Sequence, residues 1–120
     1  MKLDSPPPDG RAPRQAPQET SIAVAALRAA AGRATTLLRA LANEDRLLLV
    51  CQLVDGEKSV SELEALLDIR QPTLSQQLGV LRAEGLVSTR REGKRIFYSV
   101  ADEKALAVLT TLYGLYCPKP

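Results

Sequence analysis

The sequence contains no histidine and no tryptophan, and only two of its 120 residues are cysteine. Without histidine, the chain lacks the commonest metal ligand of proteins and the commonest general base of enzymes. No apolar run approaches the roughly 20 residues that a membrane-spanning helix needs. The first twenty residues lack the apolar segment of a secretory signal. This favours a cytoplasmic location, in which the cysteines are thiols rather than structural disulfides.

The positive charge is concentrated in one part of the chain. The formal net charge is only +2. Residues 70–100 hold six basic and two acidic side chains, a net charge of +4, whereas residues 21–69 hold five basic and seven acidic ones, a net charge of −2. A basic third in a weakly charged protein indicates one face suited to an anionic polymer such as nucleic acid.

Two regions differ in composition. Residues 1–20 are rich in proline and glutamine and have almost no large apolar side chain, which predicts a disordered N-terminal tail. Residues 21–117 are expected to form one domain. It begins with an alanine- and leucine-rich helix in which Gly32 is a point where the helix can break or kink.

Asn43 is expected to cap a second helix, NEDRLLLVCQLV, which ends at the turn Asp55-Gly56. Its core-side positions, spaced i, i+3, i+4 and i+7, are predicted to be Leu47, Val50, Cys51 and Val54. A short third helix, SELEALL, follows a serine cap at Ser59 or Ser61. Its inner face is expected to consist of Leu63, Leu66 and Leu67.

A fourth helix is predicted near residues 71–84, with Pro72 in its first turn and Gly85 after its end. Leu74, Leu78 and Leu81 recur at i, i+4 and i+7 and should face the core. The runs LVSTR and RIFYSV then predict a hairpin around a charged turn at residues 92–94. Asp102 is expected to cap a last helix that Pro118 terminates.

The fold class is therefore mainly α with a β-hairpin. A short helix, a turn, a polar-faced helix and a basic hairpin, in this order, are typical of a winged helix-turn-helix. Glutamine and serine side chains on the second of these helices can bond to base edges, and hairpin cations can bond to phosphates of double-stranded DNA. The predicted DNA-binding residues are Ser59, Arg70, Gln71, Thr73, Ser75, Gln76, Gln77, Arg82, Arg90, Arg91, Lys94 and Arg95.

The stretch LANEDRLLLVCQLVDGEKSVSELEALLDIRQPTLSQQLGVLRAEGLVSTRREGKRIFYSV resembles the ArsR family of winged-helix repressors, and the resemblance extends over residues 21–117. It implies a homodimer joined through the first and last helices, a recognition helix near residues 71–84, and repression at an operator that an inducer relieves. The sequence departs from the family pattern at Arg70, where serine is usual, and at Gln77, where histidine is frequent.

The metal-sensing motifs of that family are missing. The helix before the turn has no C-x-C pair, and the last helix has no histidine ligand. The two cysteines, Cys51 in LLLVCQLV and Cys117 in LYGLYC, instead resemble the persulfide-responsive ArsR repressors of the SqrR and BigR type. This resemblance implies that inorganic polysulfide or a low-molecular-weight persulfide links the two sulfurs and releases operator DNA upstream of sulfide-detoxification genes. Tyr113 and Tyr116 would flank the sensing pair.

Other interpretations of the cysteines remain. The same two thiols could bind arsenite or respond to general oxidants. An enzyme, such as a thiol oxidoreductase, is disfavoured because the chain has no C-x-x-C, no histidine base and no glycine-rich phosphate loop. No cofactor is expected.

Overall fold

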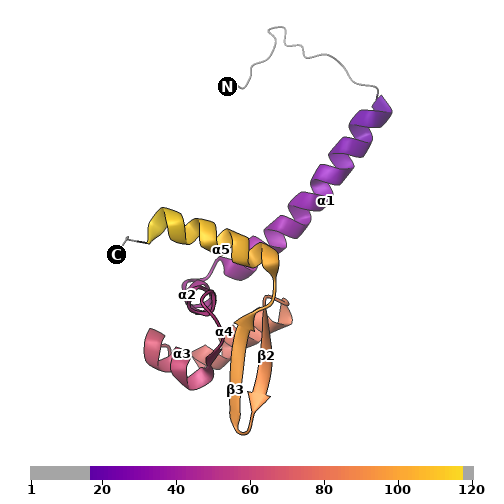
Figure 1. Cartoon of the computed structure of the whole chain (residues 1–120). Coiled ribbons are helices and arrows are strands. Elements are labelled where there is room, and N and C mark those ends of the chain that lie inside the picture. Colours follow the sequence, from indigo (N-terminus) through magenta and orange to yellow (C-terminus); the bar gives the residue numbers. More distant parts are fainter. Residues whose placement is uncertain (1–16, 118–120) are drawn as a thin grey trace. The chain divides into compact units, whose positions relative to one another are not determined.

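The computed structural model describes residues 17–117 (Figure 1). Its helices are α1 (Pro17–Leu41), α2 (Glu44–Leu53), α3 (Val60–Leu67), α4 (Thr73–Ala83) and α5 (Glu103–Tyr116). Its strands are β1 (Lys58–Ser59), β2 (Val87–Glu92) and β3 (Arg95–Val100). This order confirms the predicted fold class, in which four helices precede a hairpin and a last helix follows it.

Helix α1 begins earlier than expected and has no break. It starts at Pro17, where proline fits the first helical turn, and it continues through Gly32, so the helix does not break at this possible break point. One interior glycine costs a helix about 1 kcal/mol, which the surrounding alanines and leucines tolerate. The chain divides into two compact units, residues 1–35 and 36–120. The predicted tail, residues 1–20, lies mostly outside the described residues.

The core of the second unit is built from leucines on four helices. The predicted inner face of α4 is confirmed, because Leu74, Leu78 and Leu81 are at most 2% exposed. Each buried leucine of this kind contributes about 1.5–3 kcal/mol to folding. The α4 leucines pack in one cluster with buried leucines from the helices before and after them; these partners are Leu49 and Leu53 on α2, Leu63 on α3 and Leu109 on α5.

The buried faces of α2 and α3 differ from the predicted ones. In α2 the fully buried residues are Leu49, Val50 and Leu53, whereas Cys51 is only half-buried at the edge of the core. In α3, Leu63 is buried as predicted, but Leu66 is exposed. Both helices are short and rich in leucine, so spacing alone leaves the direction of the buried face open.

The wing is a three-stranded antiparallel sheet in the order β1-β3-β2 (Figure 1). The hairpin of β2 and β3 was predicted, and Gly93 closes it with a positive φ of 63°, which glycine adopts without strain. Strand β1 was not predicted, because two residues are too few to show the alternation of a strand. It pairs Lys58 with Tyr98 and thereby attaches the segment after α2 to the wing.

Candidate functional site

Helix α4 presents a polar outer face. Its leucine stripe is buried, so Ser75, Gln76 and Arg82 are left exposed, and Thr73 is half-buried near the start. Gln76 and Arg82 form no side-chain hydrogen bond or ion pair with other residues in the described part of the chain. Both side chains are therefore available to a partner outside the chain.

The start of α4 is held by a side chain that the sequence analysis assigned to DNA. Pro72 occupies the cap position without a side-chain cap bond. The Gln71 amide oxygen accepts hydrogen bonds from the Ser75 backbone N–H, at 3.3 Å, and from the Ser75 hydroxyl. Gln71 thus satisfies one of the free N–H groups of the first turn. Arg70 is exposed beside Asp68, with 3.6 Å between its Nε and the carboxylate.

Gln77 is also engaged within the chain. Its Oε1 accepts a 2.8 Å hydrogen bond from the guanidinium of Arg46 on α2. Arg46 was not singled out by the sequence analysis. The only local signal at that position is the Asn43 cap, whose side chain accepts the Arg46 backbone N–H at 3.0 Å.

Ser59 caps α3 and is almost fully buried. Its hydroxyl accepts the Glu62 N–H, while the Glu62 carboxylate accepts the Ser59 N–H, so of the two predicted caps, Ser59 and Ser61, Ser59 is the one used, and it forms a capping box. These bonds lower the pKa of Glu62 below its usual range. Arg95 on the wing donates to the Ser59 hydroxyl at 3.2 Å. With 2% exposure, Ser59 has almost no surface to offer to DNA.

The predicted wing cations fall into two groups. Arg90 and Arg95 both stack on the Phe97 ring, at 4.6 and 4.8 Å from its centroid. Arg90 also forms a two-pronged bond with Glu57, with N–O distances of 2.6 and 3.2 Å, and this bond lowers the pKa of Glu57. The side chains of these two arginines therefore stabilise the wing through contacts within the chain. Arg91 and Lys94 are exposed around the hairpin turn and have no partner among residues 17–117.

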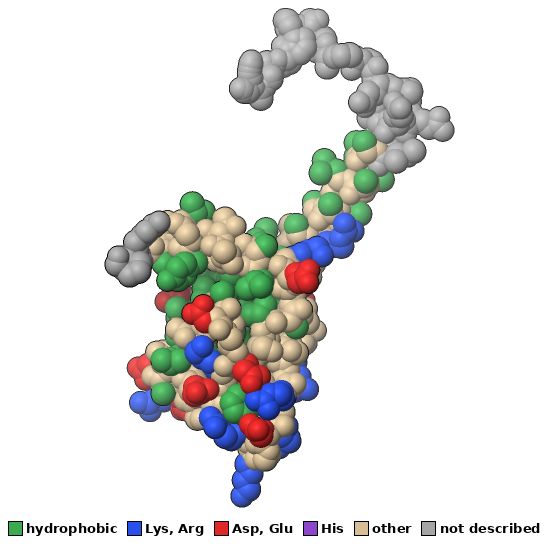
Figure 2. All heavy atoms as spheres, in the orientation of Figure 1, with side chains coloured by type: hydrophobic (Ala, Val, Ile, Leu, Met, Phe, Trp, Pro, Cys, Tyr) green, Lys and Arg blue, Asp and Glu red, His purple; other side chains and the backbone are tan. Residues whose placement is uncertain are grey.

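Cations and carboxylates alternate over the wing and the helices beside it. In the space-filling view, Lys and Arg side chains extend to the tip of the wing, with acidic side chains interspersed above it (Figure 2). Arg91 and Lys94 are exposed cations beside the hairpin turn. Cations so placed suit contact with a phosphate backbone rather than with base edges.

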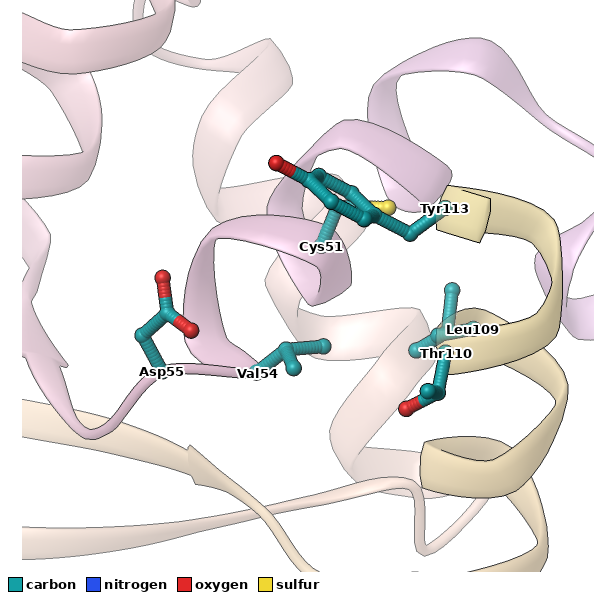
Figure 3. A pocket seen from close by; sticks show the side chains of 6 residues that line it. All are labelled: Cys51, Val54, Asp55, Leu109, Thr110 and Tyr113. Atoms are coloured by element: carbon teal, nitrogen blue, oxygen red, sulfur yellow. The ribbon is translucent and has the colours of Figure 1, made fainter. Parts of the chain in front are cut away.

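A cavity lies beside Cys51, where α2 faces α5. It has a volume of about 170 Å³ and is lined by Cys51, Val54, Asp55, Leu109, Thr110 and Tyr113. The Tyr113 ring lies next to the Cys51 side chain, and Leu109 and Thr110 extend from α5 toward Val54 (Figure 3). Of the two tyrosines predicted to lie near the thiols, Tyr113 thus lines this cavity, whereas Tyr116 is 80% exposed and is not among its lining residues.

Cys51 lies beside the cavity on α2, and Cys117 lies at the C-terminal cap of α5. Burial raises the pKa of the Cys51 thiol, and negative charge on Cys117 raises it further. Cys117 is exposed and caps α5, with its N–H donating to the Tyr113 carbonyl at 3.0 Å. Both thiols are free. The half-buried Cys51 thiol lies where α2 faces α5, and the exposed Cys117 thiol lies at the C-terminal end of α5.

The described residues contain no cluster of three or more histidine, cysteine, aspartate or glutamate side chains arranged to hold a metal ion. None of the described helices is both long and apolar enough to cross a membrane.

The comparisons with known proteins agree on one family. Residues 43–89 match the model of bacterial regulatory proteins of the arsR family. The chain is 54% identical over 96 residues to a biofilm growth-associated repressor of Agrobacterium fabrum, which covers 80% of this chain and 82% of that protein.

Two solved structures are also similar. The transcriptional repressor BigR of Xylella fastidiosa superposes with a TM-score of 0.73 at 48% identity, covering 78% of this chain and 95% of that one. Reduced HlyU of Vibrio cholerae superposes with a TM-score of 0.75 at 41% identity, covering 77% and 97%. The chain therefore belongs to the ArsR family of winged helix-turn-helix transcriptional repressors, closely related to the biofilm growth-associated repressors, and is not an enzyme.

Proposed function

We propose that this repressor binds operator DNA as a homodimer and releases it when inorganic polysulfide or a low-molecular-weight persulfide links Cys51 to Cys117. The observation that supports the proposal is the free Cys51 thiol at the cavity where α2 faces α5, together with the free, exposed Cys117 thiol at the C-terminal cap of α5. Release would then allow transcription of sulfide-detoxification genes.

The chemistry proceeds in two thiolate attacks. The exposed Cys117 thiolate attacks a sulfane sulfur of the inducer, whose remainder leaves as a thiolate or hydrosulfide, and Cys117 now carries one or more added sulfur atoms. Where Cys117 carries at least two added sulfur atoms, the Cys51 thiolate attacks the added sulfur next to the terminal one and expels the terminal sulfur as hydrosulfide, which leaves added sulfur in the link. Two thiols are oxidised and inducer sulfur is reduced, so no further oxidant is needed. The raised pKa of the Cys51 thiol lowers its thiolate fraction, so the first attack falls to the exposed Cys117.

The cavity beside Cys51 supports selectivity for sulfur donors. Its 170 Å³ give room beside the Cys51 thiol for added sulfur atoms, at about 2 Å per bond. A peroxide adds no sulfur, so it can only form a direct disulfide. Where the two Sγ atoms cannot reach bonding distance, peroxide is a poor inducer and a sulfur donor is a good one.

The DNA interface of the proposal uses α4 and the wing tip. Gln76, Ser75 and Arg82 on the outer face of α4 are placed to read bases, and Arg91 and Lys94 at the hairpin turn are placed to bind phosphates. Arg70 precedes α4 and Thr73 is its first residue, and both are placed to contact the phosphate backbone of the DNA. Five other residues that were predicted to contact DNA already bond within the chain, so their contribution to DNA binding is indirect. They are Ser59, Gln71, Gln77, Arg90 and Arg95.

The dimer of the proposal is joined through α1 and α5. Helix α5 exposes large apolar side chains along its last two turns, with Tyr113, Leu115 and Tyr116 between 61% and 80% exposed. Helix α1 likewise exposes Val24 and Leu27. A second copy covering these faces would remove them from water, which is the main driving force of association.

The test treats the reduced protein separately with polysulfide, hydrogen peroxide and arsenite. Peptide mass spectra should show Cys51 joined to Cys117 with extra sulfur masses only after polysulfide, together with loss of DNA binding. A peptide pair joined by arsenic, or a plain disulfide after peroxide that releases DNA equally well, would instead support the metalloid or general-oxidant alternative. The variants Cys51→Ser and Cys117→Ser should each stay bound to DNA under polysulfide. Normal release by either variant would refute the two-thiol switch.

A further inference from the structure

Arg46 connects three helices through its side chain. It is half-buried near the start of α2, and its Nε donates to the Ala40 carbonyl at 2.6 Å while one terminal nitrogen donates to the Arg39 carbonyl at 3.3 Å. Its other terminal nitrogen donates to Gln77 Oε1 on α4 at 2.8 Å. One guanidinium thus joins the end of α1 to α2 and to α4.

The end of α1 explains why an arginine occupies this position. The last carbonyls of a helix have no partner within the helix, and they carry the negative end of its dipole. A guanidinium offers five N–H donors in a rigid fork, so it can cap two carbonyls and still donate outward. The Asn43 cap fixes the Arg46 backbone as well. The direction of the bond to Gln77 is therefore set before any DNA is bound.

Gln76 and Gln77 are neighbours with different surroundings. Gln76 is exposed, and its side chain has no partner in the described part of the chain. Gln77 is half-buried, and its acceptor oxygen is used by Arg46. A glutamine that reads adenine needs both its amide donor and its oxygen acceptor for the base edge. The bond to Arg46 holds the Gln77 amide toward α2, so this side chain is not placed to pair with a base edge.

We propose that Arg46 and Gln77 form a positioning pair, which fixes α4 against α2 and the end of α1, and that Gln77 does not read bases. This inference rests on the proposed use of α4 as the recognition helix. Cys51 lies five residues beyond Arg46 on the same helix, about 7.5 Å along its axis. The pair therefore also joins the thiol-bearing helix to the helix that faces DNA.

The first experiment places the same added charge on each glutamine. Gln77→Glu and Gln76→Glu are compared in the full reduced chain by fluorescence anisotropy. The specific probe is a duplex selected by the wild-type protein from a random-sequence pool, and the non-specific probe is a scrambled duplex of equal length. Glutamate at 77 keeps an acceptor for Arg46, so specific affinity should fall by less than about threefold. Gln76→Glu should cost about tenfold or more, the scale of one lost base contact.

The second experiment tests the bond itself in a double-mutant cycle. Arg46→Met and Gln77→Met should each lower specific affinity about tenfold, the scale of one hydrogen bond to a charged group, and the double variant should be no worse than either. Gln77→Glu in the Arg46→Met background should lose the affinity that it keeps alone. Non-specific affinity and thermal melting monitor folding. If Arg46→Met fails to fold, Arg46→Lys replaces it, since one ammonium cannot reproduce the fork.

The outcomes separate this inference from the proposed interface. Equal losses from Gln77→Glu and Gln76→Glu, or additive losses in the cycle, would show that Gln77 contacts DNA and would overturn the positioning pair. No loss from any of the Gln76 and Gln77 variants would instead show that α4 is not the recognition helix, and the proposed interface itself would fail.

Discussion

Helices α4 and α5 both carry apolar residues at helical spacing, yet a single chain covers them to different extents. The inner leucines of α4 are at most 2% exposed. In α5, Ala105 and Leu109 are buried, but Tyr113 and Leu115 are 61% and 70% exposed. The leucine face of α4 is thus covered by the same chain, which leaves polar groups exposed on its outer face. Helix α5 retains apolar surface, which is the kind of surface a second copy covers.

The largest expected effect is on the free energy of unfolding, from a substitution in the buried face of α4. Leu78→Ala leaves a cavity among the core leucines and should lower the free energy of unfolding by about 2–5 kcal/mol. The matched variant Leu115→Ala removes a side chain that one chain leaves exposed, so a monomer should lose only about 0.5 kcal/mol or less. Urea unfolding of the reduced protein measures both.

The same unfolding experiment, repeated at several protein concentrations, tests whether a second copy covers α5. If a second copy covers α5, the effect of Leu115→Ala should grow with protein concentration, because association then contributes to stability. Equal losses from Leu78→Ala and Leu115→Ala at low concentration would contradict the described difference between the helices.

A smaller effect compares the outer face of α4 with the wing. Gln76→Ala should cost about 1–3 kcal/mol in binding the selected duplex and little in binding a scrambled one. Arg91→Ala should weaken binding to both duplexes similarly and lower the salt slope by about 1. Titrations at several salt concentrations measure both quantities. A sequence-independent loss from Gln76→Ala would remove α4 from base recognition.

The smallest expected effect is on the pKa of Cys51, which lies where α2 faces α5. The pKa of Cys51 is raised mainly by burial and further by charge on Cys117. The rate of Cys51 alkylation should therefore keep rising with pH beyond the range of an ordinary cysteine, because the thiolate is the nucleophile. Cys117→Ser removes the smaller cause only, so the pKa of Cys51 should fall partway toward its usual value. An unchanged pKa in that variant would place the thiols out of range of each other.

The sequence predicted best where polar and apolar residues separate cleanly. In α4 the three leucines are divided by glutamine, serine and glycine, so their spacing identified the buried face correctly. In α2 the run LLLV has no such separation, and the predicted core-side set missed the buried Leu49 and Leu53, while Cys51 packs against the core at its edge. Strand β1 was missed because two residues carry no periodicity, and it exists only because β3 pairs with it.

The sequence by itself determined the order of the helices, the serine-capped start of α3, the basic hairpin and the presence of two thiols. These features depend on residues a few positions apart, so local spacing reveals them. The tertiary structure decided which glutamine of α4 is free and which is bonded to Arg46, 31 residues away. It also placed Cys51 beside Tyr113 of α5, at the cavity where α2 faces α5. Such pairs depend on which surfaces meet in the packed core, and no spacing along the chain specifies that.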